Sequence, residues 1–314
     1  MRRALIIGAG GQDGRLLAPF LADRGYDVHG WIRRELSESA PCATTIVDIL
    51  SPSDVEKKLD LLQPNEIYYL AAFHHATEDS ISSSMGDLLR RSFDVHVSGL
   101  LHVLSAIKRH CPYARLFYAA SSHIFGKSEK DWQDEGTPLR PDSPYAISKT
   151  AGLRCCQLFR QRENIFAATG ILFNHESALR TSSFVSKKIV RGALQARRDP
   201  AFQLDLGDLD AHADWGYAPD YVDAMFRILQ LPQASDYVVA SGELHSVREF
   251  VELAFDEVGL DWRDHVSTKE DLLKRDAYPL RGDASKLRHA TGWSPALKFD
   301  QLVRQLVQET GESL

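Results

Sequence analysis

Two side chains one helical turn apart have the chemistry to move a proton. In the stretch "YAISK", Tyr145 and Lys149 are spaced i and i+4, which places both on one face of a helix. A lysine ammonium lowers the pKa of a nearby phenol, so the phenol can exchange a proton with a substrate hydroxyl while a hydride leaves the adjacent carbon. The same spacing also arises by chance, so its meaning depends on the residues around it.

A second reactive group follows a predicted strand, at "ASSHIFG". We expect the Ser121 hydroxyl to hydrogen-bond the same substrate oxygen as Tyr145, with Ser122 next to it. His123 comes directly after them, and a neutral imidazole with a pKa of about 6.5 can accept a proton near neutral pH. His123 is therefore either a catalytic base or a polar residue that only lines a pocket, and both interpretations stay open.

A glycine-rich turn near the start of the chain is typical of a dinucleotide site. "GAGGQDG" follows the apolar run "ALII" and contains Gly8, Gly11 and Gly14, with Gln12 and Asp13 between the last two. Glycines at a strand-to-helix turn permit a tight turn, close approach of a pyrophosphate and close packing of helix on strand. The Gly-x-x-Gly-x-x-Gly spacing differs from the Gly-x-Gly-x-x-Gly of many dehydrogenases, and an ordinary glycine turn is the alternative.

The end of the second predicted strand distinguishes NAD from NADP. An acidic residue there usually binds the ribose 2′-hydroxyl of NAD, whereas arginine accommodates the 2′-phosphate of NADP. This chain has Arg33 and Arg34 at that place, which favours NADP over NAD. Asp48 and Ile49, at the end of the third predicted strand, could flank the adenine. The alternatives are a solvated arginine pair and an exposed aspartate at a strand end.

These residues need a scaffold, and the first half of the chain predicts one by alternating strands with helices. We expect strands at 4–8, 27–33, 44–49, 66–72, 115–121 and 166–173. We expect helices at 14–25, 53–62 with a serine cap at its start, 85–111 and 143–162. Such alternation indicates an α/β fold: a Rossmann-type, doubly wound parallel sheet with helices on both faces. We assign residues 1–173 to this NADP-binding domain, which also carries the serine, tyrosine and lysine.

From residue 174 the alternation loosens. Helices are predicted at 183–197, 221–230, 246–258 and 299–311, with short strands at 202–206 and 237–241. We interpret residues 174–314 mainly as a smaller substrate-binding lobe, with some segments returning to the Rossmann sheet. This lobe would close over the carboxyl edge of the sheet, where ligands of such sheets bind.

Composition and charge argue against several classes of protein. The 314 residues carry a net charge of −6, whereas nucleic acid as a main partner requires a basic face. No apolar run has membrane-spanning length, and the first residues do not form a signal peptide. The four cysteines (Cys42, Cys111, Cys155 and Cys156) show no metal-ligand spacing. We expect free thiols, no metal site and a cytoplasmic protein.

Longer stretches carry a family resemblance. The chain resembles extended short-chain dehydrogenases/reductases that act on nucleotide sugars, and most of all the GDP-mannose 4,6-dehydratases. The matching stretches run over nearly the whole chain: "GQDG", "DVHGWIRR", "SPYAISK", "GILFNHES", "LDAHADWGYAPDYVDAM" and "GELHSVREFVE". The resemblance implies a tightly held NADP that oxidises C4 of a GDP-hexose. Loss of water across C5–C6 and return of the hydride to C6 would follow.

The resemblance also assigns residues to the two ligands. Beyond the glycine turn, the positions that the resemblance implies for the cofactor are Arg33, Asp48, Ile49, Leu70, Ala72, His175 and Arg180. We also assign their neighbours Arg34 and Ala71 to the cofactor. Asn174 and Lys188 align with residues that face the nucleotide sugar. His74 stands where the family has serine, and it either touches sugar hydroxyls or is only a polar residue at a strand end.

The sequence departs from the family at the residue on which elimination depends. The dehydratases have Thr-Ser-Glu where this chain has Ser121, Ser122 and His123, and that glutamate removes the C5 proton and helps water leave C6. Related 4-keto-sugar reductases and epimerases need no glutamate there. We therefore keep two enzymatic hypotheses: an NADP-dependent GDP-sugar dehydratase, and an NADPH-dependent reductase or epimerase of a GDP-linked 4-keto deoxyhexose or heptose. A regulatory protein without turnover is a third, and the intact Tyr145 and Lys149 argue against it.

Other departures concern assembly and the pocket. The stretch after Arg34 is shorter than the family loop that supports a tetramer, so we expect a homodimer through two long helices. Residues 76–85 form a polar insertion that could wall the sugar pocket. Ala213 replaces a family arginine suited to a diphosphate. Nearby positive charge could come from His212, Arg275 or Arg281.

Overall fold

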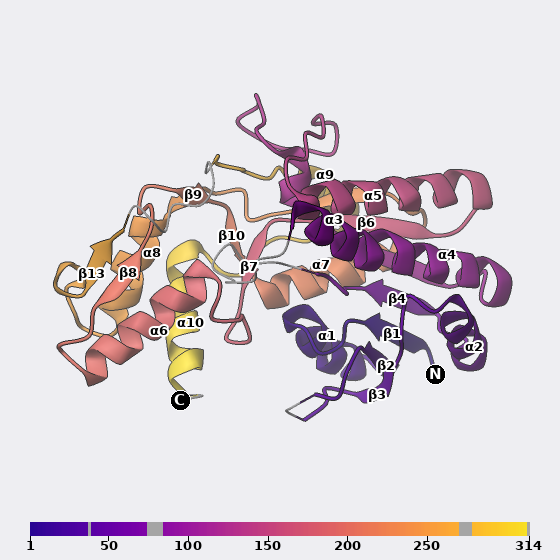
Figure 1. Ribbon diagram of the computed structural model, residues 1–314, viewed down its shortest axis with the longest axis horizontal. Coiled ribbons are helices and arrows are strands. Elements are labelled where there is room, and N and C mark those ends of the chain that lie inside the picture. Colours follow the sequence, from indigo (N-terminus) through magenta and orange to yellow (C-terminus); the bar gives the residue numbers. More distant parts are fainter. Residues whose placement is uncertain (37–38, 74–83, 270–277, 313–314) are drawn as a thin grey trace.

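The computed structural model describes residues 1–36, 39–73, 84–269 and 278–312 (Figure 1). His74, Arg275 and most of the 76–85 insertion lie outside the described residues, so the expectations for them are not tested. None of the described helices is both long and apolar enough to reach across a bilayer.

A seven-stranded parallel sheet forms the centre of the larger part of the molecule. Its strands are β1 (Arg3–Ile7), β2 (Asp27–Ile32), β3 (Ala43–Ile46), β4 (Glu66–Tyr69), β5 (Arg115–Ser121), β6 (Ala167–Leu172) and β11 (Asp236–Val239). Their order is β11-β6-β5-β4-β1-β2-β3, so the chain winds outward from β1 in one direction and then from β4 in the other. The predicted doubly wound fold is confirmed, and the switch point between β1 and β4 is where such sheets bind ligands.

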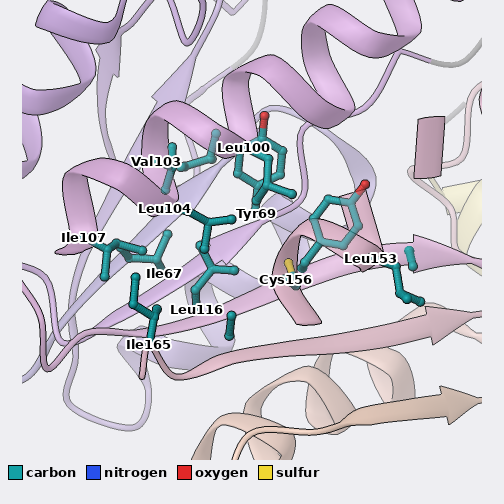
Figure 2. Packing of buried hydrophobic residues seen from close by; sticks show 14 of the residues in the cluster. Ile67, Tyr69, Leu100, Val103, Leu104, Ile107, Leu116, Leu153, Cys156 and Ile165 are labelled. Atoms are coloured by element: carbon teal, nitrogen blue, oxygen red, sulfur yellow. The ribbon is translucent and has the colours of Figure 1, made fainter. Parts of the chain in front are cut away.

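Helices cover both faces of this sheet, which is why its inner strands are almost uniformly apolar. One face packs against α2 (Pro52–Leu62), α4 (Gly99–His110) and α5 (Pro144–Glu163). The other packs against α1 (Gln12–Ala22), α7 (Ala218–Gln230) and α9 (Ser285–Thr291). Figure 2 shows the first of these cores, where Leu104 and Ile107 of α4 meet Ile67 and Leu116 of the sheet.

The long helix expected at 85–111 is present, but it is not one regular helix. It consists of α3 (Met85–Phe93), a π-helical turn at Asp94–Ser98, and α4. The sequence pattern did not reveal the π turn, whose carbonyls accept hydrogen bonds from tyrosines of the sheet. A smaller difference concerns α2, which is capped by Ser51 and not by Ser53.

The C-terminal residues form a second hydrophobic core and also return to the sheet. Helices α6 (Val185–Arg198), α8 (Val247–Glu257) and α10 (Phe299–Glu312) pack together with β8 (Leu204–Leu206) and β13 (Val266–Thr268). The predicted strand at 237–241 corresponds to β11, which pairs with β6 at the edge of the main sheet. Two short pairs connect these regions: β7 (Asn174–Glu176) with β10 (Trp215–Tyr217), and β9 (His212–Ala213) with β12 (His245–Ser246).

The glycine turn between β1 and α1 is tightly packed on two sides. Gly8 has a φ of +95°, and a Cβ there would lie 2.7 Å from the backbone nitrogen of Ala71, after β4. A Cβ on Gly14 would lie 2.7 Å from the Cα of Ala9. A Cβ on Gly11 would meet only the Gly8 carbonyl oxygen, at 3.4 Å. Gly8 and Gly14 are therefore required by the fold, whereas Gly11 is not.

We predict that the Gly14→Ser variant loses about 1–3 kcal/mol in the free energy of unfolding, because its Cβ overlaps backbone atoms that cannot move away independently. The matched Gly11→Ser variant should stay within about 0.5 kcal/mol of the wild type, because serine is a good N-cap and the site has room for it. Urea unfolding of the three proteins measures this difference. Equal losses for the two variants would contradict the packing described for this turn.

Candidate functional site

The serine, histidine and tyrosine predicted from two separate motifs come together at the carboxyl end of β5. Ser121 is the last residue of β5, and its Oγ accepts a hydrogen bond from the backbone nitrogen of His123 at 3.3 Å. Ser122 is buried at the start of the short 3-10 turn that follows. Tyr145 lies in the first turn of α5, and its ring meets that of His123 edge to face, with centroids 6.1 Å apart.

Local sequence explains why Tyr145 stands at the start of a helix. Ser143 caps α5 by accepting a hydrogen bond from the backbone nitrogen of Ala146, at 3.2 Å. Pro144 occupies the first helical position, where its missing N–H is not needed. The cap fixes the first turn of α5, and thereby the height of Tyr145 above the sheet.

Burial dominates the ionisation of both members of the tyrosine–lysine pair. It raises the pKa of Tyr145 to about 12, although a hydrogen bond with Ser121 and the charge of Arg180 act in the opposite direction. It lowers the pKa of Lys149 to about 7, against the opposing effect of Asp13. The Lys149 Nζ donates to the Ala119 carbonyl oxygen at 2.7 Å and lies 5.6 Å from the centroid of the Tyr145 ring.

The expectation that Lys149 lowers the pKa of Tyr145 is therefore wrong for the protein alone. The i, i+4 spacing does place the two side chains near each other, as predicted. The same environment that holds them together also excludes water, which disfavours both the phenolate and the ammonium. At neutral pH the tyrosine is therefore protonated, and the pKa of the lysine is close to the pH.

A buried ion pair joins the glycine turn to the strand after β6. The His175 Nε2 lies 3.1 Å from both carboxylate oxygens of Asp13, and its Nδ1 lies 2.7 Å from the Phe173 carbonyl oxygen. Because both neighbours are acceptors, both ring nitrogens donate and the imidazole is positively charged. Burial opposes this charge, but Asp13 outweighs it and raises the pKa of His175. Despite its own burial, the carboxyl group of Asp13 has its pKa lowered to about 2, chiefly by His175.

Hydrogen bonds from Gln12 support the same connection. Its Nε2 donates to the His175 carbonyl oxygen at 3.1 Å, and its Oε1 accepts from the Ser177 hydroxyl at 2.9 Å. The His175 ring also stacks on Tyr221, with centroids 4.6 Å apart. In this structure Gln12, Asp13 and His175 thus bind one another, and they anchor the first turn of α1 beneath the site.

The other residues predicted for the cofactor surround the glycine turn. Arg33 and Arg34 are exposed just beyond β2, and Asp48 is exposed after β3. Ile49 is half-buried, Ala71 packs against Gly8, and Leu70 and Ala72 flank Ala71. The N-terminus of α1 has no side-chain cap, and the position of a Cβ on Gly11 is nearly clear of protein atoms. These features fit a pyrophosphate bound to backbone N–H groups.

A cavity of about 200 Å³ adjoins the site on the side of the C-terminal lobe. Asn174, Arg180, His212 and Ala213 are among its lining residues. The Arg180 guanidinium stacks on the Phe184 ring at 3.6 Å. Lys188, predicted to face the sugar, does not line this cavity, and its charge acts on Asp205 of β8.

A larger groove of about 720 Å³ lies elsewhere in the C-terminal lobe. Trp262, Phe299, Glu249 and Asp256 are among the residues that line it. None of the residues predicted to bind or react with a ligand lines this groove. Size alone therefore does not identify the site, and the chemistry of the side chains points to the carboxyl edge of the main sheet.

Sequence reasoning missed one residue of this region, His96. It is completely buried in the π turn, and its ring contacts the Tyr145 ring with centroids 5.3 Å apart. The available signal was a histidine in the mostly apolar helical stretch "DVHVSGLLHVL", which also contains His102. A pattern of this kind does not show what the imidazole contacts.

The Asp13–His175 pair predicts a pH dependence of stability. Because the folded pKa of His175 is raised above its ordinary 6.5, its contribution is fully present below that pH and is lost as the pH rises through the raised value. Because the folded pKa of Asp13 is lowered, its contribution to stability is present above pH 3.8 and is lost as the pH falls to about 2. The difference in unfolding free energy between wild type and His175→Gln should shrink from pH 6.5 upward. A difference that stays constant to about pH 9 would contradict the ion pair.

Comparison with known proteins agrees with the geometry. The sequence profile of the family described as GDP-mannose 4,6 dehydratase matches residues 5–306. GDP-mannose 4,6 dehydratase 1 of Arabidopsis thaliana is 36% identical, over 98% of this chain and 89% of that protein. The human GDP-mannose 4,6 dehydratase is 35% identical, over 97% of this chain and 90% of that protein.

Solved structures show the same fold at lower identity. A dTDP-glucose 4,6-dehydratase from Bacillus anthracis, in complex with NAD, superposes with a TM-score of 0.83 at 18% identity, covering 98% of this chain and 96% of that one. RMD from Pseudomonas aeruginosa, complexed with NADPH, gives a TM-score of 0.80 at 22% identity, covering 99% and 100%. Because the family profile and these relatives match nearly the whole chain, the chain belongs to the GDP-mannose 4,6-dehydratase family.

Proposed function

We propose that this chain is an NADP-dependent GDP-sugar dehydratase of the GDP-mannose 4,6-dehydratase type. It would oxidise C4 of the hexose, eliminate water across C5–C6 and return the hydride to C6. The observation that carries the proposal is the meeting of Ser121, His123 and Tyr145 at the carboxyl end of β5, with Lys149 behind them. A hydroxyl, a proton acceptor and a phenol are the groups this sequence of steps requires.

The dinucleotide would lie across the switch point between β1 and β4. The backbone of the glycine turn would bind its pyrophosphate, and the exposed Arg33 and Arg34 would bind a 2′-phosphate. The bound nicotinamide supplies the capacity to accept and return a hydride. The solved relatives named above include both an NAD and an NADPH complex, so the preference for NADP depends on the two arginines of this chain.

Tyr145 and Lys149 would handle the proton of the C4 hydroxyl. Tyr145 carries its own proton in the protein alone, with its pKa at about 12. A nearby anion favours the ammonium form of Lys149, and that ammonium in turn favours the phenolate of Tyr145. Ligand binding would thus activate a pair that burial holds inactive. Ser121 would hydrogen-bond the same oxygen.

His123 would act as the base and then as the acid of the elimination. Its neutral imidazole would take the proton from C5, and the resulting imidazolium would give a proton to the departing C6 hydroxyl, which leaves as water. One group can perform both steps because no net proton is gained or lost. A glutamate in the family position would act in the same order.

The replacement of glutamate by His123 also supports a second candidate function. A 4-keto-sugar reductase needs only a proton donor and a hydride donor, for which Tyr145 and NADPH suffice. In that case His123 would line the pocket. The two functions differ in whether the nicotinamide is regenerated within one turnover.

Residues 1–173 would bind the cofactor, and residues 174–314 would mainly form the lobe that binds the substrate. The cavity lined by Asn174 and Arg180 would bind the nucleotide sugar. His212 also lines it, next to Ala213, the position at which the family has arginine.

We also propose a homodimer through the long helices. Ile147 and Leu158 of α5 support it, because 38% and 54% of these apolar residues are exposed in the single chain.

The purified protein should release NADP on denaturation and should convert GDP-mannose to a product lighter by one water without added NADPH. Tyr145→Phe should lower the rate by about 100-fold or more. His123→Ala should stop at the 4-keto stage, where the absorbance of reduced cofactor accumulates. His289→Ala, exposed on α9, serves as the control.

Two outcomes would contradict parts of this proposal. Full-rate elimination by His123→Ala would remove His123 as the base. Oxidation of added NADPH in the presence of a 4-keto-sugar, with no conversion of GDP-mannose, would replace the dehydratase by the reductase.

A further inference from the structure

The π turn between α3 and α4 is held by hydroxyl groups from the sheet. A π turn displaces carbonyl groups from the regular helical pattern, and such turns are frequent at functional sites. Here the Val95 carbonyl oxygen accepts from the Tyr69 hydroxyl at 2.5 Å, and that of His96 accepts from the Tyr118 hydroxyl at 3.3 Å. The two tyrosines are buried in β4 and β5. The irregular turn is therefore a specified feature, and it sets the orientation of His96.

The His96 side chain joins two separate parts of the site. Its Nε2 lies 3.0 Å from the backbone nitrogen of Phe73, in the segment after β4. Its Nδ1 lies 2.8 Å from the Ser148 Oγ, and Ser148 donates to the Tyr145 carbonyl oxygen at 2.9 Å. His96 and Ser148 are both completely buried. A continuous chain of hydrogen bonds thus runs from the segment after β4 to the first turn of α5.

These bonds assign the tautomer of His96. The Phe73 N–H can only donate, so Nε2 must be unprotonated. The Ser148 hydroxyl gives its proton to the Tyr145 carbonyl, so Nδ1 must carry a hydrogen and donate it to Ser148. The imidazole is neutral, and each of its nitrogens has a different and necessary role.

The His96 ring also touches Tyr145 directly. The two rings are edge to face at 88°, and the His123 ring meets Tyr145 at 89°. Tyr145 therefore has imidazole rings from two different elements against its own ring. His123 comes from the turn after β5, and His96 comes from the π turn.

We propose that His96 is a positioning residue, which orients Tyr145 for proton transfer by fixing the first turn of α5 to the end of β4. This inference rests on the function proposed above for Tyr145. His96 itself exchanges no proton with substrate, because both of its nitrogens are engaged by protein groups. A shift of about 1 Å in a reacting group is enough to cost roughly 100-fold in rate, so the loss of this connection should reduce turnover.

Gln and Met at position 96 provide a matched test, because they have nearly the same shape and differ in hydrogen bonding. His96→Met should lower kcat by about 100-fold and leave KM nearly unchanged, because Tyr145 acts on the bound sugar. His96→Gln retains an acceptor and a donor, and it should recover most of this loss. His110→Met, at the far end of α4, is the control for removing a histidine from the same helix. Ser148→Ala removes both hydrogen bonds of the Ser148 hydroxyl, to His96 and to the Tyr145 carbonyl, without a large cavity, and it should share the kcat defect.

A further measurement does not depend on turnover. Long-range proton–nitrogen NMR of the wild-type imidazoles, assigned by loss of the His96 signal in His96→Gln, should show the neutral Nδ1–H form at neutral pH. The Nε2–H form would overturn the inference even if the protein is not a dehydratase. Equal kcat for the Met and Gln variants would also overturn it, whereas a wild type inactive on GDP-mannose would contradict only the proposed function.

Discussion

Exclusion of water at the carboxyl edge of the sheet is the constraint on which the site depends. Tyr145 and Lys149 are held where neither is easily charged, so the pKa of the phenol is raised and that of the amine is lowered. Asp13 keeps its charge in the same region chiefly because His175 lies 3.1 Å away and is positively charged. A charged ligand bound there would therefore alter the ionisation of Tyr145 and Lys149.

The fold supplies this environment through its strand order. Winding the sheet outward from β1 and β4 brings the glycine turn against the segment after β4, close enough that Gly8 has no room for a side chain. The same edge receives the end of β5, the start of α5 and the π turn. Residues far apart in the sequence, such as Asp13, His96 and Tyr145, therefore share one region. The C-terminal core lies beside this edge and contributes the cavity with Arg180.

Much of the fold and part of the site could be predicted from the sequence, because they depend on local patterns. The strand and helix alternation and the glycine turn each depend on a few consecutive residues. Arg33 and Arg34 were located at the end of β2 for the same reason.

What could not be predicted depends on contacts between elements. The hydroxyls of Tyr69 and Tyr118 bind carbonyls of the π turn from the sheet, and the role of His96 depends on that turn. The ionisation of Lys149 depends on burial, which the i, i+4 spacing does not reveal. The Asp13–His175 pair joins residues separated by most of the Rossmann domain. The glycine turn assigned Asp13 to the cofactor and the resemblance assigned His175, but neither showed that the two side chains bind each other.

A crystal structure with GDP-mannose and NADPH is the decisive measurement, because the reduced cofactor cannot start C4 oxidation. We expect the Tyr145 hydroxyl to lie about 2.6–3.2 Å from the C4 oxygen, with a His123 ring nitrogen facing C5. A sugar bound with C4 out of reach of Tyr145, or with C5 turned away from His123, would contradict this expectation.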